Sequence, residues 1–383
     1  MMDPLARTCI HDFPTELLRH IFQFLPLFSR DIPRERPLAL ESRKQEDWHK
    51  DPLSWRAPAW RPPGLAIYHV CRRWRTVVHN SQDLWTIIPL RDPVLAELAL
   101  ARSRSASICI HIDLGLLDLL PDYLNTARKV VEHMPRAHEI SMSGERLGPI
   151  GPSAWKTFVT QAVNFLQQHP APLLESFQLR DSLGERLPDD IFQGVCPRLC
   201  EVRVSHTVGP ASCLLAAPLT VFGLDHGAVG ITPENPEQLI QADTAQYALY
   251  KWAYLSAALK NFSNLRELSL CHIRNGPSLF VGPLERHTLQ FPRLDKLVLS
   301  GDISHVKHCL VSLSVSATIE LHLRCNVGLG FSADGLATET FGQVVDIIHD
   351  MMDDHGRNVD DSGLAFRHLG VRWVHPPCSG PLL

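Results

Sequence analysis

Several short motifs that carry enzyme chemistry are missing from this sequence. It contains no GxSxG turn for a serine nucleophile, no GxxxxGK[ST] loop for phosphates and no GxGxxG dinucleotide fingerprint. The HExxH pattern of zinc peptidases is also missing, and no two cysteines have the CxxC spacing that many zinc sites use. We therefore expect a protein that is not an enzyme, with no catalytic residue, no cofactor and no metal ion.

Charge and cysteine content point away from nucleic acid and from an oxidising compartment. The 383 residues have a formal net charge of −4, which provides no basic footprint for nucleic acid. The 10 cysteines have no paired spacing, and the first residues lack the apolar core of a secretion signal. We expect a cytoplasmic or nuclear protein whose thiols are reduced and act as small apolar side chains.

One stretch is long enough to cross a bilayer, because residues 204–224 contain no formally charged side chain. Serine, threonine and histidine dilute its hydrophobicity, and Gly209, Pro210 and Pro218 would interrupt a membrane helix. We expect a strand, a loop and a second strand here, and no membrane partner.

One segment leaves a metal-dependent enzyme open as an alternative. In residues 346–361, His349 and Asp353 stand four positions apart, so a helix would place both on one face, where they could share a metal ion. The segment contains no cysteine, and its acidic residues do not have the spacing of an EF-hand loop. A solvated helix end explains these side chains more simply.

Two segments near the N-terminus have the apolar periodicity of helices that need to be covered. Residues 12–26 begin with Asp12 and Pro14, end at Pro26 and carry one apolar stripe. Residues 66–90 carry a second. The stripes consist of Leu17, Leu18, Ile21, Phe22 and Leu25, and of Ile67, Val70, Cys71, Trp74, Val77 and Val78. Segments this short seldom support a core of their own. Either the following domain or a partner must therefore cover the stripes.

The residue types in these two segments resemble an F-box. The resemblance lies in FPTELL followed by IF, in VCRRWR and in the closing LW, which are residues 13–18, 21–22, 70–75 and 84–85. Phe13 stands where the family usually has leucine. The resemblance covers residues 10–90 and implies docking onto a Skp-family adaptor of a cullin ubiquitin ligase. The implied adaptor-binding residues are Pro14, Leu17, Leu18, Ile21, Phe22, Leu25, Val70, Cys71 and Trp74.

A long insertion at residues 29–65 separates the two halves of this F-box-like region. Its prolines stand among alternating charges, so it cannot sustain a helix or a strand for long. Trp48, Trp55 and Trp60 are unusual in a linker, because indole rings are costly to leave in water. These rings either lie across the neighbouring helices or form a short docking motif.

The rest of the chain repeats an LxxLxL-like phrase. Clear copies begin at residues 174, 199, 219, 265 and 294, which are 25, 20, 46 and 29 residues apart, and the 46 is twice 23. Weaker copies begin at 137, 319 and 366. Alternation within each phrase predicts a short strand, and helical fillers at 154–170 and 244–262 separate some of the phrases. This spacing predicts an irregular leucine-rich repeat, an α/β solenoid, with a mixed α/β domain as the alternative.

We thus expect an α+β or α/β protein: an F-box-like helical domain at 10–90, a repeat domain at 93–375 and a tail at 376–383. F-box followed by irregular repeats resembles the F-box proteins of mushroom-forming fungi and implies a subunit that recruits an unknown protein substrate. A non-catalytic repeat scaffold outside any ligase is the alternative. The outward strand positions form a row, whose basic residues are the predicted substrate contacts. They are Arg180, Arg203, Lys296, Arg324 and Arg372.

Overall fold

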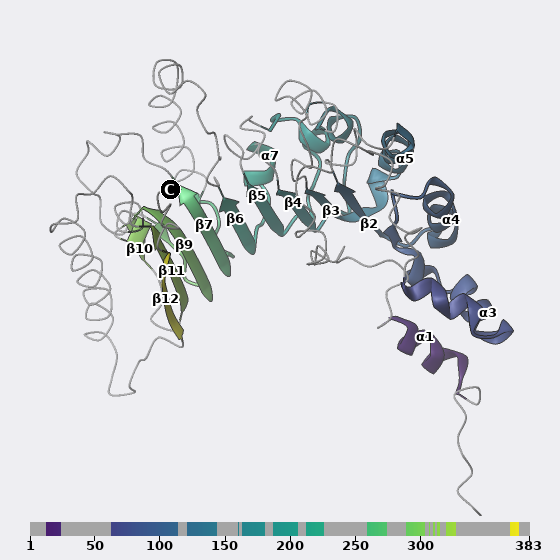
Figure 1. The fold of residues 1–383 in the computed structure, drawn as a ribbon. Coiled ribbons are helices and arrows are strands. Elements are labelled where there is room, and N and C mark those ends of the chain that lie inside the picture. The colour runs from purple at the N-terminus through teal and green to yellow at the C-terminus, as the bar shows by residue number, and fades with distance from the viewer. Residues whose placement is uncertain are drawn as a thin grey trace, which may run out of the picture. The chain divides into compact units, whose positions relative to one another are not determined.

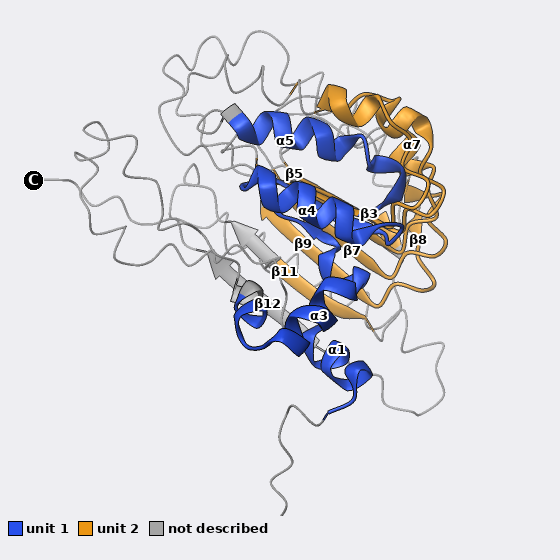
Figure 2. Cartoon of the chain, turned by 90° about the vertical axis from the view of Figure 1, so that its right-hand side faces the viewer, with its two compact units in different colours: residues 1–112, 120–138 blue, residues 113–119, 139–383 orange. Residues whose placement is uncertain are grey.

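The chain forms two compact units, residues 1–112 with 120–138 and residues 113–119 with 139–383 (Figure 2). The first unit therefore extends past residue 93, where the sequence places the start of the repeat domain. Leu25, the His349 and Asp353 segment and most of the insertion lie outside the described residues. The computed structural model describes residues 13–23, 63–113, 121–143, 160, 163–180, 187–205, 212–225, 259–273, 289–302, 306, 309–310, 312–314, 319–326 and 368–374.

The first unit is mainly helical, with one short pair of parallel strands, β1 and β2. Asp92 caps helix α4 by accepting hydrogen bonds from the backbone N–H groups of Val94 and Leu95. The elements are α1 (Thr15–Gln23), η3 (Pro63–His69), α3 (Arg72–Asn80), η4 (Gln82–Trp85), β1 (Ile87–Ile88), α4 (Pro93–Ser103), β2 (Ile108–Asp113), α5 (Pro121–Val131) and η6 (Met134–Arg136).

The second amphipathic segment is not one continuous helix. It divides into η3, α3 and η4, and the break falls at Val70 and Cys71. The backbone of Cys71 is extended, with φ −160° and ψ 168°, and its sulfur accepts a hydrogen bond from the backbone N–H of Trp74 at 3.4 Å. Cys71 therefore caps α3 instead of continuing an apolar stripe, because its thiol satisfies an amide that has no partner within the helix.

The second unit is built on a parallel β-sheet, so the protein is a mixed α/β structure (Figure 1). Its main strands are neighbours in the order β3-β4-β5-β6-β7-β9-β11-β12, and β8 and β10 form a separate parallel pair. The elements are β3 (Ala137–Ser143), β4 (Ser176–Arg180), η7 (Ile191–Gly194), β5 (Glu201–Ser205), α7 (Ser212–Leu215), β6 (Val221–Asp225), β7 (Glu267–Ile273), β8 (Leu289–Gln290), β9 (Lys296–Asp302), β10 (Leu313–Ser314), β11 (Glu320–Asn326) and β12 (His368–Val374).

The repeated apolar phrase accounts for these strands, as the sequence predicted. The three apolar residues of each of the five clear copies are at most 3% exposed. Two of them lie on the inward face of the strand, and the first lies just before the strand begins. In the order of the chain they are Leu174, Phe177, Leu179, Leu199, Val202, Val204, Leu219, Phe222, Leu224, Leu265, Leu268, Leu270, Leu294, Leu297 and Leu299.

A ladder of backbone hydrogen bonds aligns the strands at their N-terminal ends. The carbonyl of Glu175, just before β4, accepts from the amide of Cys200, and the carbonyl of Cys200 accepts from Thr220 at 2.8 Å. The same pattern continues from the amides of Arg266 and Asp295 to the preceding strand. Each strand therefore starts at the same level, and equivalent residues of successive phrases lie opposite each other in register.

Two neighbouring residues on β7 test this alternation. Leu268 is fully buried, whereas Ser269 lies on the outward face. We expect Leu268→Ala to lower the free energy of unfolding by about 2 to 5 kcal/mol, because it leaves a cavity in the core. Ser269→Ala is the matched control and should change it by about 0.5 kcal/mol or less. Urea denaturation of the intact protein measures both, and equal effects would contradict the assigned alternation.

Candidate functional site

Helix α1 divides its apolar stripe between the interior and the surface. Leu18 and Phe22 are fully buried, whereas Leu17 is 42% exposed and Ile21 is partly exposed. Pro14, which precedes the helix, is exposed too. Leu17 and Leu18 are about 100° apart around the helix, and here Leu18 is buried while Leu17 remains exposed. The stripe therefore both holds α1 in place and leaves apolar side chains at the surface.

The segment around α3 divides in the same way. Trp74 is half-buried, with its ring edge-on to Phe22 and the centroids 4.9 Å apart. Val70, at the break before α3, is 52% exposed, and Cys71 is partly exposed. The structure thus brings α1 and α3 together through Phe22 and Trp74. Among the described residues of these two segments, the large exposed apolar side chains are Leu17 and Val70.

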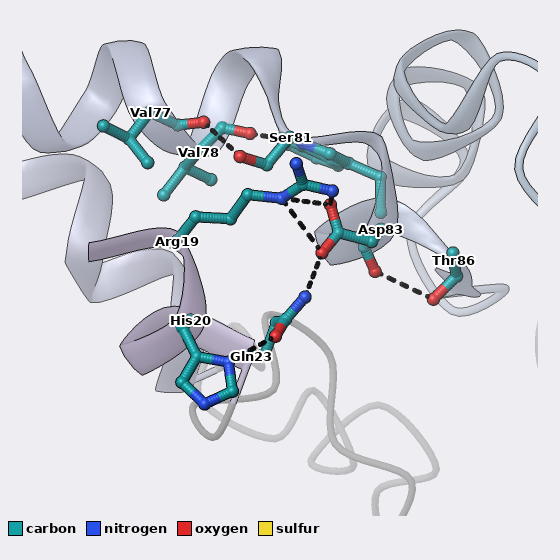
Figure 3. Close-up of polar contacts among 9 residues, drawn as sticks. Arg19, His20, Gln23, Val77, Val78, Ser81, Asp83 and Thr86 are labelled. Atoms are coloured by element: carbon teal, nitrogen blue, oxygen red, sulfur yellow. Dashed lines mark hydrogen bonds and ion pairs between the residues drawn. The ribbon is translucent and has the colours of Figure 1, made fainter. Parts of the chain in front are cut away.

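A polar cluster that the sequence did not indicate joins α1 to η4 (Figure 3). The guanidinium of Arg19 donates to both carboxylate oxygens of Asp83, with the shortest distance 2.8 Å, and the amide of Gln23 donates to the same carboxylate. Arg73 of α3 also donates to the backbone carbonyl of Phe13. These contacts set the position of α1, and no motif in the sequence distinguishes Asp83 from other surface acids.

The contacts of Asp83 change its acidity. Partial burial acts to raise the pKa of the carboxyl group, but the hydrogen bonds from Gln23 and Arg19 outweigh it and lower the pKa below its ordinary value. Asp83 is therefore ionised through the neutral range and keeps its contacts with α1. A carboxyl group with a lowered folded-state pKa stabilises the folded form above its unfolded pKa, and this contribution is lost as the pH falls through the folded pKa.

A second candidate site lies on the outward face of the sheet in the second unit. We call Glu201, Arg203, Glu267 and Lys296 the charged face. Nε of Arg203 lies 2.7 Å from Oε1 of Glu201, and its Nη1 lies 3.2 Å from Oε1 of Glu267. Nζ of Lys296 is 3.6 Å from the same Glu267 oxygen. Burial opposes the charge of Arg203, but the hydrogen bonds that it donates to the two glutamates raise its pKa. This surface is therefore a connected chain of opposite charges.

A glycine allows this chain of charges to cross the sheet. Arg203 on β5 and Glu267 on β7 are separated by β6, where Gly223 pairs with Arg203 in register. A Cβ atom at Gly223 would lie 3.2 Å from Cγ of Arg203, which is tighter than ordinary contact. The arginine side chain passes over the strand because nothing projects there. A glycine within a strand often marks such a close approach, and no pattern in the sequence identifies Arg203 as the side chain that approaches.

The five predicted substrate contacts do not form one row. Pairing places Lys296 level with Glu201 and Glu267, and Arg203 one level further along the strands. Arg180, Arg324 and Arg372 fall on a third level, where Arg324 and Arg372 are direct partners on β11 and β12. Arg180 is exposed and donates to Gln178. The five basic residues thus occupy three levels along the strands, and their contact with a substrate stays a prediction.

One contact in the first unit involves groups of the kind that bind metals. The sulfur of Cys109 lies 3.4 Å from Nε2 of His138. Thiolate and imidazole are both zinc donors, but a thiol–imidazole hydrogen bond also accounts for this distance. The predicted pair His349 and Asp353 lies outside the part of the chain that the structure describes, so its geometry adds nothing to a metal-dependent mechanism.

Comparisons with known proteins give no further indication of what these residues do. A scan against protein-family models, a search of curated proteins and a search of solved structures find no match for this chain. Among the described residues, no helix has the length and apolar character needed to span a bilayer.

The Asp83 cluster makes a pH-dependent prediction. We expect Arg19→Gln to raise the pKa of Asp83 toward its ordinary value, because the variant loses the guanidinium contact. The acid-induced loss of stability below about pH 4 should then be shallower than in the unmodified protein. A carboxyl titration followed by NMR measures the first effect, and unfolding at several pH values measures the second. Arg72→Gln removes the same charge from α3 and should leave the Asp83 titration unchanged.

Proposed function

We propose that this chain is the substrate-recognition subunit of an SCF-type cullin ubiquitin ligase. The N-terminal helices dock a Skp-family adaptor, and the outward face of the sheet in the second unit recruits a protein target. The observation that supports this most directly is the packing of α1 on α3 through Phe22 and Trp74, which leaves Leu17 and Val70 exposed. The residues that form this arrangement belong to the motifs that resemble an F-box.

The division of the apolar stripes favours a docking role over mere capping of the protein's own core. Only a few large apolar side chains of the described residues are exposed, namely Leu17, Val70, Val94, Leu98 and Val195. Leu17 and Val70 belong to the residues that the F-box resemblance assigns to adaptor binding. Scattered exposed apolar residues are normal on a protein surface, but these two stand on segments that contact each other. Burying them against a partner would recover the free energy of removing them from water.

The charged face supports recruitment of a protein rather than a small molecule. Its ions are one-fifth to two-fifths exposed and hold one another in place, so they present fixed donors and acceptors of both signs. Such a surface confers specificity and orientation on a protein partner more than raw affinity. Parallel strands that start at the same level spread these groups over several strands, which suits an extended contact area.

A repeat scaffold that acts outside any ligase is the second candidate. The burial of Leu18 and Phe22 within the first unit favours it, because those side chains need no partner. The two functions differ in one measurable property, which is binding of a Skp-family adaptor. The metal-dependent alternative concerns His349 and Asp353, which lie outside the described residues, so it stays a prediction.

Adaptor binding should depend on the exposed members of the stripes. We expect Leu17→Glu combined with Val70→Glu to weaken binding of a Skp-family adaptor by at least about tenfold, because a loss of roughly 1.4 kcal/mol is enough for that factor. The variant should retain its thermal stability, since both side chains are already in contact with water. Calorimetric titration of the full-length protein with purified adaptor measures the effect.

Val94→Glu is the matched control for this experiment. Val94 is 75% exposed on α4 of the same unit and lies outside the predicted adaptor-binding residues. It should bind the adaptor as the unmodified protein does. Undiminished binding by the Leu17 and Val70 double variant would rule out this docking surface, and lack of binding by the unmodified protein would favour the scaffold.

Target capture should depend on the face of the sheet. We expect Arg180→Glu combined with Lys296→Glu to reduce capture of acidic targets, because arginine and lysine at these positions offer the positive charge that such a target needs. Adaptor binding should be unaffected. Lys260→Glu, at an exposed position just before β7, carries the same kind of charge reversal and should capture targets normally. Quantitative comparison of ubiquitin-modified proteins in cells that express each variant measures capture, and an identical profile for both would remove the sheet face from target recognition.

A further inference from the structure

Three side chains with metal-ligating atoms come together near the starts of the neighbouring strands β2 and β3. The sulfur of Cys109 on β2 lies 3.4 Å from Nε2 of His138 on β3. Glu139, the next residue of β3, adds a carboxylate, and one ligand atom from each of the three residues lies within 4.8 Å of the other two. Among the residues that the structure describes, no other three side chains of this kind come so close.

The start of β3 departs from the alternation of a regular strand. Ala137 and Ile140 are fully buried, whereas His138 and Glu139 between them are both partly exposed. Successive side chains of a regular strand point to opposite faces, so two ligands at neighbouring positions would normally be separated. The interrupted pattern of β3 instead leaves the ligand atoms of both residues close to the sulfur of Cys109.

The distances suit one tetrahedral ion. Zinc lies about 2.3 Å from a cysteine sulfur and about 2.0 Å from a histidine nitrogen, so these two atoms are about 3.5 Å apart in a tetrahedral site. The 3.4 Å between Cys109 and His138 agrees with this separation. The carboxylate of Glu139 ends a flexible, partly exposed side chain, so a small rotation brings an oxygen to the third position. A thiol–imidazole hydrogen bond accounts for two of the three groups, whereas a shared ion accounts for all of them.

We propose that Cys109, His138 and Glu139 bind a zinc ion at the start of β3. The inference does not depend on the ligase proposal. A thiolate ligand favours zinc over magnesium and calcium, which prefer oxygen ligands. Cys109 is 1% exposed, and the ion supplies the positive charge that a thiolate needs when it is buried. Three protein ligands leave a fourth position for water, which reaches the ion past the two partly exposed side chains.

The site joins ligands from distant parts of the sequence. Cys109 and His138 are 29 positions apart, and none of the three ligands belongs to a CxxC or HExxH motif. Closely spaced ligands are the signal by which most zinc sites are recognised in a sequence, which explains why the sequence predicted no metal ion. Bound zinc would link β2 to the start of β3 and stabilise the folded form, because unfolding separates the ligands.

Titration of the full-length protein with cobalt tests the proposal, because the absorption spectrum of cobalt reports its ligands. The protein, free of any histidine tag, is treated with a chelator, dialysed and titrated with cobalt, and zinc is then added. We expect a near-ultraviolet band from charge transfer between sulfur and cobalt, which grows until one cobalt is bound per chain and disappears as zinc displaces the cobalt. Absence of binding, or binding without the sulfur band, would overturn the proposal.

Variants identify the ligands. Cys109→Ala should abolish the sulfur band, whereas Cys271→Ala, which removes a partly exposed thiol from β7, should retain it. Glu139→Gln should weaken zinc binding at least about tenfold, a loss that is typical even of groups that only support a metal ligand. Glu132→Gln makes the same change at an exposed position and should bind zinc as the unmodified protein does. A band that survives Cys109→Ala, or equal affinities of the two glutamine variants, would contradict the site.

A second measurement covers the case in which Cys109→Ala fails to fold, since the thiol that it removes is buried. Zinc should raise the thermal unfolding temperature of the unmodified protein and of Glu132→Gln, because it binds the folded form. It should raise that of Glu139→Gln less. Circular dichroism during heating measures all three, and an equal rise in the three proteins, or no rise in any of them, would overturn the proposal.

Discussion

Alternation of apolar and polar side chains along parallel strands is the constraint on which the second unit depends. Each strand commits one face to the core, and a shift by one residue would exchange the core side chains for the charged ones. The backbone ladder from Glu175 through Cys200 and Thr220 removes this freedom, because each strand begins where its neighbour does. Packing of the apolar residues and alignment of the polar ones are therefore consequences of the same register.

The alignment of the strands brings the charged residues onto one face of the sheet, but their contacts with one another depend on a glycine, which has no side chain to block them. Glu267 accepts from Arg203 across an intervening strand because Gly223 leaves the path open. Lys296 reaches the same carboxylate from the other side. Exposed ion pairs contribute little to stability individually, so the value of this chain of charges lies in orienting its members. Partner recognition through such a face would depend on an arrangement that is already in place before binding.

In the first unit, the apolar residues of α1 and α3 have two roles. Some of them pack the two helices together, and others remain exposed. Phe22 and Trp74 join α1 to α3, and Arg19 with Asp83 joins α1 to η4. Leu17 and Val70 contribute less to these contacts than Phe22 and Trp74 do, since about half of each residue remains exposed. A docking role for these residues costs the fold little, because its own core is formed by their neighbours.

The sequence by itself determined the apolar positions of the strands and of α1. Those patterns are local: a period of two or of 3.6 residues identifies the apolar side of a strand or helix. In α1 it did not distinguish the buried Leu18 and Phe22 from the exposed Leu17. It also indicated Cys71 and Trp74 as members of one segment, but not the break that makes Cys71 a cap, because that depends on a single sulfur contact with the backbone.

Only the tertiary structure decided which polar residues meet. The predicted basic residues fall on three levels of the sheet instead of one, since register depends on where each connection delivers its strand, and the connections differ in length and composition. The contacts of Asp83 with Arg19 and of Glu267 with Arg203 join segments whose sequences carry no mark of each other. Periodicity is encoded within a few residues, whereas these contacts depend on backbone paths determined by the packed core, which no short stretch of sequence specifies.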